Sequence, residues 1–277
     1  MSKKSIDFSK FSSFKIGGIF EVSLLNACEE LPQNYYLIGS CNNILVGKKP
    51  PPLVKLSKVY DYIKIKNSTL IIGGATPSGK IASFCKKNNI ANFEFLSHLP
   101  GTLGGIVYMN AGLKEYEIFN YLIAIETCKG TIEKKDIDFG YRYAKIDSPI
   151  LEASFEIDYG FDSLKVEMFK KMRANQPSTP SAGSCFKNPA GNYAGRLIEE
   201  VGLKGFRVGG MEFSTEHANF LVNAGNGVFE DAVFLIQEAQ KRVYEKFKIW
   251  LECEIVILDI NYMGEQSPFM TPPQRES

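Results

Sequence analysis

The chain has 277 residues, of which 44% are hydrophobic and 23% are charged, and its formal net charge is +1. This length and composition are typical of a globular protein with one large domain or two smaller ones. The net charge gives no reason to expect a nucleic-acid or membrane partner, and no apolar run approaches the roughly 20 residues that span a bilayer.

The six cysteines are scattered without a C-x-x-C pair, and only two histidines, His98 and His217, accompany them. We therefore expect no metal site. The first residues carry two lysines with no apolar stretch after them, so a secretory signal is not expected either. Reduced, partly buried thiols are favoured over a disulfide framework, and the expected location is the cytoplasm.

Short apolar runs alternate with glycine-rich turns over the first 160 residues. A helix is predicted over Lys80–Asn88, and residues 121–132 predict a β-hairpin. Strands are predicted where an apolar run leads into a turn, at Tyr35–Ile38, Thr69–Ile72 and Ile106–Met109.

The composition changes near Arg173. Residues 174–181 carry two prolines and no apolar periodicity, which indicates a loop at a domain boundary. Helices are predicted over Tyr193–Val201 and, with an amphipathic pattern, over Phe229–Phe247. The polar, proline-bearing residues 261–277 are expected to be disordered. The predicted division is thus 1–172, 173–260 and a tail.

The apolar stretch Ile249–Ile260 predicts a strand near the end of the chain. On such a strand Glu252 and Glu254 would project from one face, roughly 7 Å apart. A single carboxylate would indicate an exposed strand edge. Two in an otherwise apolar strand are unusual and make this segment a candidate for chemistry.

Gly74-Ala-Thr-Pro-Ser-Gly-Lys80 matches part of the phosphate-binding P-loop pattern and lies between a predicted strand and a helix. Ile81 follows where a Ser or Thr hydroxyl should ligate the metal, and Pro77 removes a backbone donor from the loop. We interpret the match as accidental, although a nucleotide-binding module or triphosphatase remains an alternative.

Two other glycine-rich turns offer backbone N–H groups that no side chain covers. They are Gly39-Ser-Cys-Asn-Asn43 and Pro100-Gly-Thr-Leu-Gly-Gly105, the latter followed by Asn110-Ala-Gly112. Such turns can lie against a diphosphate without a metal or a lysine. Neither fits G-x-G-x-x-G, so a nicotinamide-binding Rossmann fold is not expected.

The segment Pro180–Pro189 contains Ser184, Cys185, Lys187 and Asn188. Ser184 is not the nucleophile of a hydrolase elbow, because G-x-S-x-G is absent. Cys185 and His217 could form a thiol nucleophile and its base, but a buried cysteine is favoured.

In this order, the motifs resemble those of the UDP-N-acetylenolpyruvoylglucosamine reductases, flavoenzymes of peptidoglycan precursor synthesis. The resemblance runs from Phe14 to Asp259, nearly the whole chain. The sequence elements that carry it most specifically are Pro100–Gly105 with Asn110–Gly112, Tyr141-Arg142, Pro180–Ser184 with Asn188-Pro189, Gly202–Gly205, His217–Asn223 and Leu251–Glu254.

The resemblance implies an α+β fold, with an FAD-binding domain of the vanillyl-alcohol-oxidase / p-cresol methylhydroxylase type and a smaller α+β substrate-binding domain. It implies that NADPH reduces FAD and leaves, and that UDP-N-acetylglucosamine enolpyruvate then takes the same pocket. Flavin N5 would give hydride to C3 of this substrate, and the product would be UDP-N-acetylmuramate. No obligate protein partner is implied.

The resemblance also assigns roles to single residues. Ser184 would protonate C2, while Arg142 and Glu254 would stabilise the enolate-like intermediate. A fixed, planar guanidinium suits a developing enolate, and a neutral hydroxyl can quench a strongly basic carbanion. The implied substrate-binding residues are Lys187, Asn188 and His217. The implied cofactor-binding residues are Gly39, Ser40, Cys41, Asn42, Asn43, Pro100, Gly101, Thr102, Gly104, Gly105 and Asn110.

Some positions depart from the family pattern. Cys41 and Asn42 stand where the family usually has glycine and serine, and Ala144 stands where serine is common. No long insertion carrying a tyrosine follows Gly112, which indicates the shorter subtype of the family. A flavin oxidase of the same fold, acting on another small substrate, is a further alternative.

Overall fold

The computed structural model describes residues 1–263 and 269, and its helices and strands form an α+β fold as expected. The chain divides into two compact units. Unit 1 comprises residues 1–4, 22–40 and 52–174, and unit 2 comprises 5–21, 41–51 and 175–277. The two short N-terminal segments of unit 2 therefore group with the C-terminal part of the chain, which a linear division at Arg173 does not anticipate.

The first sheet is made of short strands in the order β1-β2-β5-β3. Strand β5 runs parallel to both β2 and β3, so that Leu53 lies opposite Val22 on one side and Tyr36 on the other. The strand bounds are β1 Ser2–Asp7, β2 Ile19–Leu25, β3 Tyr36–Ile38 and β5 Leu53–Leu56.

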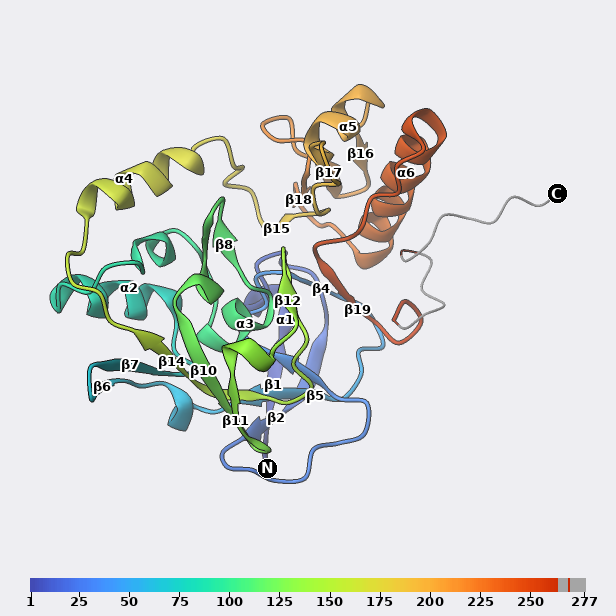
Figure 1. The fold of residues 1–277 in the computed structure, drawn as a ribbon. Helices are drawn as coiled ribbons and strands as arrows, with labels where there is room; N and C mark the ends of the chain where they lie inside the picture. The colour runs from blue at the N-terminus through green and yellow to red at the C-terminus, as the bar shows by residue number, and fades with distance from the viewer. Residues whose placement is uncertain (264–268, 270–277) are drawn as a thin grey trace. The chain divides into compact units, whose positions relative to one another are not determined.

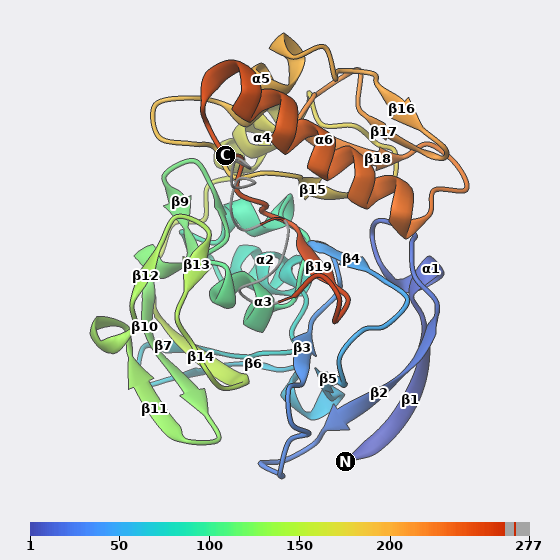
Figure 2. The same ribbon diagram turned by 90° about the vertical axis from the view of Figure 1, so that its right-hand side faces the viewer.

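A second, antiparallel sheet forms the centre of unit 1, in the order β11-β10-β14-β7-β6. Figures 1 and 2 show α2 and α3 on one face of this sheet, and buried residues of both helices share a core with Leu70 and Ile72. The bounds are β6 Ile63–Lys66, β7 Thr69–Gly73, α2 Ser78–Lys87, α3 Leu103–Tyr108, β10 Leu122–Thr127, β11 Gly130–Glu133, β14 Ile150–Glu156 and α4 Ser163–Met172.

Unit 1 also carries two hairpins that matter for the candidate site, and four short 3-10 helices. The hairpins are β8 Gly112–Leu113 with β9 Tyr116–Glu117, and β12 Phe139–Gly140 with β13 Tyr143–Ala144. The 3-10 helices are η1 Lys58–Tyr60, η2 Glu94–Ser97, η3 Ile118–Asn120 and η4 Lys134–Asp136. Only two residues connect β8 to β9, so Gly112 is followed by a tight turn and not by a long insertion.

The prediction of a strand over Ile106–Met109 is wrong, because these residues belong to or follow helix α3. Leu103, Ile106 and Val107 are buried at the i, i+3, i+4 spacing of a helix. The β-branched residues suggested a strand, but the two preceding glycines allow the helix to approach the backbone of β7: Gly104 N–H donates to the Gly74 carbonyl at 2.8 Å. Tertiary packing outweighs the local propensity here.

Unit 2 is built on an antiparallel sheet in the order β15-β18-β17-β16, which α6 covers (Figures 1 and 2). A parallel pair of strands, β4 and β19, adds to its core. The bounds are α1 Phe8–Phe11, β4 Ile44–Val46, β15 Ser181–Ser184, α5 Ala194–Glu200, β16 Arg207–Val208, β17 Met211–Phe213, β18 Phe220–Asn223, α6 Phe229–Phe247 and β19 Val256–Leu258.

The strand predicted over Ile249–Ile260 is much shorter than expected. Only Val256–Leu258 forms β19, and Cys253 makes an isolated bridge with Phe186. Glu252 and Glu254 therefore do not lie on one regular strand. Most of the expected disordered tail lies outside the described residues, but Phe269 is described, and it is 5% exposed within the core of unit 2.

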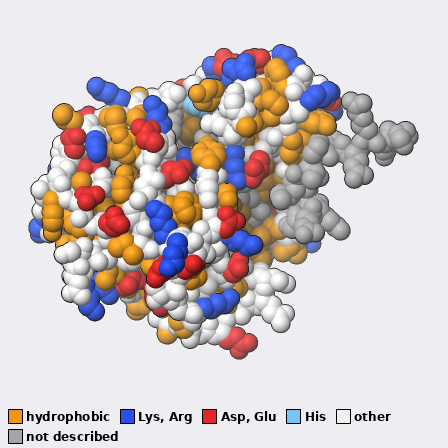
Figure 3. Space-filling model, in the orientation of Figure 1, with side chains coloured by type: hydrophobic (Ala, Val, Ile, Leu, Met, Phe, Trp, Pro, Cys, Tyr) orange, Lys and Arg blue, Asp and Glu red, His pale blue; other side chains and the backbone are white. Residues whose placement is uncertain are grey.

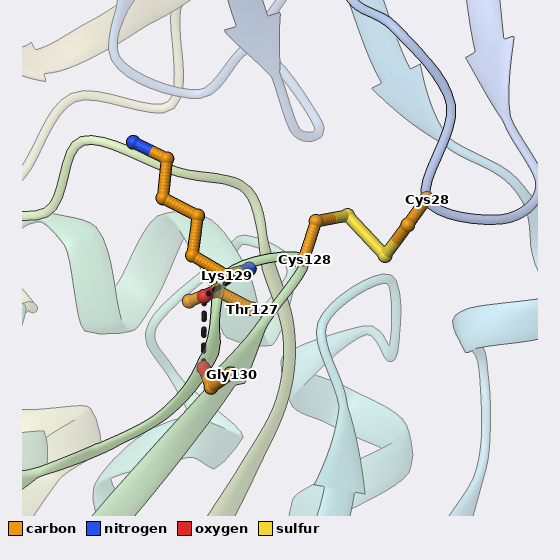
Figure 4. The surroundings of a disulfide bond; sticks show 5 residues. All are labelled: Cys28, Thr127, Cys128, Lys129 and Gly130. Atoms are coloured by element: carbon orange, nitrogen blue, oxygen red, sulfur yellow. Dashed lines mark hydrogen bonds between the residues drawn. A yellow bond between two sulfur atoms is a disulfide. The ribbon is translucent and has the colours of Figure 1, made fainter.

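Two of the six cysteines form a disulfide, which corrects the expectation that all thiols are reduced. Cys28 and Cys128 are bonded, with their Cα atoms 5.3 Å apart (Figure 4). Cys128 lies in the turn between β10 and β11, where the Thr127 hydroxyl donates to the Gly130 carbonyl at 2.9 Å. Both cysteines are exposed, whereas Cys41, Cys85 and Cys185 are buried and form no disulfide.

The surface is mixed in character. In the face drawn in Figure 3, acidic and basic side chains are intermingled, as the net charge of +1 suggests. Within the part of the chain that the structure describes, we find no helix with both the length and the apolar character needed to cross a membrane.

Candidate functional site

In unit 1, two of the glycine-rich turns singled out from the sequence lie against each other. A Cβ atom built on Gly39 would lie 2.6 Å from the Thr102 hydroxyl oxygen, so any other residue there would require the Thr102 side chain to move. The Gly39 carbonyl accepts from the Lys55 ammonium at 2.6 Å. The end of strand β3 and the turn before α3 thus meet closely, although about sixty residues separate them in the sequence.

The segment Gly74–Lys80, which imitates a P-loop, has a structural role instead. Its N–H groups are already used: Gly74 donates to Leu151, Ala75 to Tyr60, Thr76 to Gly73 and Ser78 to Gly101. A phosphate cradle needs such donors to point at the ligand. Lys80 pairs with Asp61 at 2.8 Å on the surface. The P-loop interpretation is therefore not supported: Gly74 packs closely against the Ile150 carbonyl, whereas a Cβ on Gly79 would meet nothing within 4 Å.

Arg142 occupies the two-residue turn between β12 and β13, with a left-handed backbone at φ +62°. Its guanidinium donates from Nη2 to the Gly112 carbonyl at 3.0 Å, and Nη1 lies 3.7 Å from Oε1 of Glu117. It also lies over the ring of Tyr141, 4.8 Å from the centroid. A non-glycine residue in this conformation costs energy, and such outliers are enriched at functional sites.

Asn110 and Glu117 support the turn that carries Arg142. Asn110 is fully buried at φ +40°, and its amide donates to Glu117 at 2.8 Å and to the Gly140 carbonyl at 3.1 Å. Its carbonyl oxygen accepts from Phe119 N–H at 3.3 Å. Glu117 thus contacts both Asn110 and Arg142. The side chain of Asn110 is therefore engaged with the protein at both ends of its amide.

The turn after Gly39 continues in unit 2 with Cys41, Asn42 and Asn43. Cys41 is buried at φ +53°, a conformation that costs a residue with a side chain roughly 1–2 kcal/mol and suits the glycine expected there. Asn42 donates to the Ser13 hydroxyl at 2.6 Å, while its buried carbonyl oxygen has no hydrogen-bond partner. Asn43 donates from its side chain to the Glu254 carbonyl at 2.8 Å.

The residue after Ser184 is hydrogen-bonded to the backbone of Glu254. Ser184 ends β15, opposite Phe220 of β18. The carbonyl of the next residue, Cys185, accepts from Glu254 N–H at 2.9 Å, and its N–H donates to the Asn219 carbonyl at 2.7 Å. Both candidate catalytic residues are therefore fixed within one backbone hydrogen-bond network, although seventy residues separate them in the sequence.

Lys187 and Glu252 form an ion pair beside this network. The ammonium of Lys187 lies 2.6 Å from Oε1 of Glu252, and Lys187 N–H donates to the Glu252 carbonyl at 2.9 Å. The lysine side chain is 20% exposed and the glutamate side chain 68% exposed. An exposed partner of this kind holds the lysine weakly. Lys187 is thus oriented yet available to an incoming anion.

Asn188 and His217 both lie near the start of helix α5. The Asn188 side chain accepts from Ala194 N–H at 3.0 Å, and a Cβ on Gly195 would lie 3.2 Å from Cε1 of His217. His217 Nδ1 accepts from Asn219 N–H at 3.2 Å, which leaves Nε2 as the donor of the neutral ring. Burial, and to a lesser degree Lys204, lowers the pKa of His217 below 6.5.

Cys185 is not a nucleophile in this arrangement. Its side chain is fully buried, and burial raises the pKa of the thiol well above 9.0, with a further contribution from Cys253 and Glu254. The thiolate is the reactive form of cysteine, so this thiol is inert at neutral pH. The pairing of Cys185 with His217 as nucleophile and base is therefore wrong.

The structure thus gathers Ser184, Lys187, Asn188, His217 and Glu254 in unit 2 around the residues 185–186. Arg142 and the turn at Pro100–Gly105 belong to unit 1. Sequence reasoning did not assign Glu117, which contacts Arg142, or the side chain of Asn219, which contacts Phe186. Asn219 lies in the quoted stretch His217–Asn223, but nothing local marks it as different from Asn223.

Comparison with known proteins gives consistent matches. The model of the C-terminal domain of UDP-N-acetylenolpyruvoylglucosamine reductase matches residues 175–258, which begin where the main segment of unit 2 begins. A reductase of this name from Campylobacter jejuni (strain RM1221) is 47% identical over 258 residues, which cover 91% of this chain and 99% of the relative. One from Helicobacter pylori (strain ATCC 700392 / 26695) is 42% identical and covers 93% and 100%.

The crystal structure of UDP-N-acetylenolpyruvylglucosamine reductase (MurB) from Thermus caldophilus superposes with a TM-score of 0.82 at 27% identity. It covers 93% of this chain and 99% of that one.

An α+β fold shared over 93% of its length with a reductase, and relatives named as reductases, define this chain as an enzyme of the oxidoreductase class. The identity to relatives over more than nine-tenths of both chains goes further. The chain belongs to the UDP-N-acetylenolpyruvoylglucosamine reductase family.

Proposed function

We propose that this enzyme reduces UDP-N-acetylglucosamine enolpyruvate to UDP-N-acetylmuramate, in the synthesis of peptidoglycan precursors, with FAD as cofactor and NADPH as the source of hydride. The observation that carries the proposal is the hydrogen bond from Glu254 N–H to the carbonyl of Cys185, the residue after Ser184, which brings the two segments together. The names of the relatives supply the substrate class.

The residues proposed to hold FAD are Gly39–Asn43, Pro100–Gly105 and Asn110. Two observations fit such a group: the side-chain-free approach of Gly39 to Thr102, and the buried carbonyl oxygen of Asn42 that lacks a donor. An unsatisfied buried acceptor is costly unless a ligand or water supplies the donor. A bound FAD would supply the hydride-transfer chemistry between NADPH and C3 of the enolpyruvyl ether.

Arg142, Ser184 and Glu254 are proposed to act on the substrate. Addition of hydride at C3 leaves a carbanion at C2 that its carboxylate delocalises as an enolate. The guanidinium of Arg142 stays charged and can stabilise this enolate. The hydroxyl of Ser184 gives its proton to C2. Glu254 is half-buried, its N–H donates to the carbonyl of the residue after Ser184, and its side chain assists in stabilising the intermediate.

Lys187, Asn188 and His217 are proposed to bind the UDP-sugar. Lys187 can exchange its exposed partner Glu252 for a phosphate oxygen, because an exposed ion pair contributes little. His217 offers a neutral Nε2–H donor, which suits a carbonyl or phosphate acceptor. NADPH and the UDP-sugar would use the same pocket in turn.

The role of Ser184 is tested by following the two half-reactions separately. Ser184→Ala should leave the bleaching of the flavin by NADPH nearly unchanged, and slow its recolouring by UDP-N-acetylglucosamine enolpyruvate by at least about 100-fold, the scale of general acid catalysis. An equal loss in both half-reactions would mean that Ser184 is a structural residue. Bleaching without any response to the enolpyruvyl ether would instead favour another substrate for the same fold.

A further inference from the structure

Asn219 makes a bidentate contact with the backbone of the segment that follows Ser184. Its side chain is 3% exposed. The amide carbonyl accepts from Phe186 N–H at 3.0 Å, and the amide nitrogen donates to the Phe186 carbonyl at 2.8 Å. The side chain thus pairs with Phe186 as a neighbouring strand would, at a point where the ladder between β15 and β18 has ended.

The backbone of Asn219 also binds Cys185, the residue that lies between Ser184 in the sequence and Glu254 in the hydrogen-bond network. Its carbonyl accepts from Cys185 N–H at 2.7 Å, and the carbonyl of Cys185 accepts in turn from Glu254 N–H at 2.9 Å. Asn219 therefore forms hydrogen bonds with both Cys185 and Phe186, which follow Ser184, and Cys185 in turn forms one with Glu254. On the far side, Lys187 N–H donates to the Glu252 carbonyl. Asn219 is thus linked to Glu254 by two hydrogen bonds of 2.7 and 2.9 Å through Cys185, which is covalently joined to Ser184.

We propose that Asn219 is the positioning residue that fixes Ser184 and Glu254 relative to each other for protonation of the substrate. The inference rests on the proposed function, and Asn219 itself does not contact the reacting atoms in it. Only asparagine suits the contact, because it must accept and donate at the same short distance from the backbone. Aspartate could still accept from Phe186 N–H, but it would place a carboxylate oxygen against the Phe186 carbonyl.

Asn223 provides a matched control four residues further along the chain. It too binds backbone groups with both ends of its amide: the nitrogen donates to the Phe14 carbonyl at 3.1 Å, and the oxygen accepts from Gly225 and Gly227 N–H at 3.1 and 3.0 Å. Its partners do not include residues 184–187 or 252–254. Asn223→Asp therefore makes the same chemical change in the same unit without touching the proposed path.

The experiment compares Asn219→Asp with Asn223→Asp, and Asn219→Ser with Asn223→Ser as smaller replacements that leave room for water. Two quantities are measured on the flavin-loaded protein: the rates of the two half-reactions, and hydrogen–deuterium exchange in peptides that span residues 183–188 and 251–256. The exchange measurement does not depend on activity. Both Asn219 variants should slow recolouring by the enolpyruvyl ether by about 100-fold, the usual effect of a misplacement near 1 Å.

The rate at which NADPH bleaches the flavin should change less than about threefold in the Asn219 variants. The peptides that span 183–188 and 251–256 should exchange hydrogen for deuterium faster than in wild type. The Asn223 variants should show neither change, whatever their melting temperature. The proposal is overturned if Asn219 and Asn223 variants slow both half-reactions alike. It is also overturned if exchange at 183–188 is unchanged, or if only the Asn219 variants fail to fold. A wild-type protein that does not respond to the enolpyruvyl ether would refute the proposed function, while the exchange result would still report on the contact.

Discussion

The Cys28–Cys128 disulfide leads to a quantitative prediction for stability. The bond joins the loop after β2 to the turn between β10 and β11, both within unit 1. Both side chains are exposed, so replacement by serine removes the cross-link without opening a buried cavity. Reductants can also reach the bond. The perturbation is the double variant Cys28→Ser/Cys128→Ser, compared with oxidised and reduced wild type.

The magnitude follows from the length of chain that the bond closes. The two residues are 100 positions apart. The loss of loop-closure entropy in the unfolded chain then corresponds to about 4.7 kcal/mol at 25 °C, and measured disulfides more often contribute about 2–4 kcal/mol. We therefore expect the free energy of unfolding of unit 1 to fall by about 2–5 kcal/mol, with the reductase activity retained.

The assay combines a thiol count with denaturant unfolding. In denaturant, four free thiols should react before reduction, and all six after it. Reduction should lower the unfolding midpoint of wild type to that of the double variant, whose own midpoint should not respond to reductant. Six reactive thiols without reductant, or equal midpoints for oxidised wild type and double variant, would refute the reasoning.

Two further predictions concern single side chains. Because burial lowers the pKa of His217, its ring should titrate below 6.5 and occupy the Nε2–H tautomer at pH 7. ¹⁵N NMR can measure both, and the His98→Gln variant removes the signals of the other histidine. A midpoint at or above 6.5 would contradict this prediction. The unfolded chain takes up this proton first, so His217 should make folding less stable as the pH falls below about 6.5. Asn110→Leu removes three side-chain hydrogen bonds from a fully buried site at φ +40°. In denaturant unfolding it should lower the free energy of unfolding by about 3–6 kcal/mol. A decrease below about 1 kcal/mol would show that Asn110 does not support the turn of Arg142.

Local patterns were sufficient to predict many of the elements. Helix α6 follows from its amphipathic spacing, α2 from residues on one apolar face, and the β10–β11 hairpin from two apolar runs around Lys129-Gly130. The same reasoning failed for Ile106–Met109, where β-branched residues favoured a strand but glycines allowed a buried helix. It also overestimated β19, because the segment before Val256 is irregular chain, in which Leu251 and Ile255 are buried.

The candidate site could be recognised from motifs, but its connections could not be derived from sequence. Asn43 binds the Glu254 carbonyl across 211 positions, and Asn219 binds Phe186 across 33. Neither separation carries a periodic signal. Glu117 was not marked at all, since a single acidic residue 25 positions before Arg142 is indistinguishable from a solvated one. Contacts of this kind depend on the folded backbone.

The P-loop mimic shows how a motif can match for a different physical reason. Glycine at position 74 is required because a Cβ there would lie 2.0 Å from the Ile150 carbonyl oxygen, not because a phosphate approaches. The departure at Ile81 already argued against metal binding. The hydrogen bonds of Gly74, Ala75 and Thr76 to carbonyl groups give the direct reason.

The activity we propose is the transfer of hydride from NADPH through FAD to an enolpyruvyl UDP-sugar. The most direct test is an anaerobic titration of the purified wild-type protein, followed by absorbance in the flavin band. We predict a yellow protein that one equivalent of NADPH bleaches. One equivalent of UDP-N-acetylglucosamine enolpyruvate should then restore the colour, with UDP-N-acetylmuramate as the product. A colourless folded protein, or a bleached one whose colour returns only with oxygen, would contradict the account.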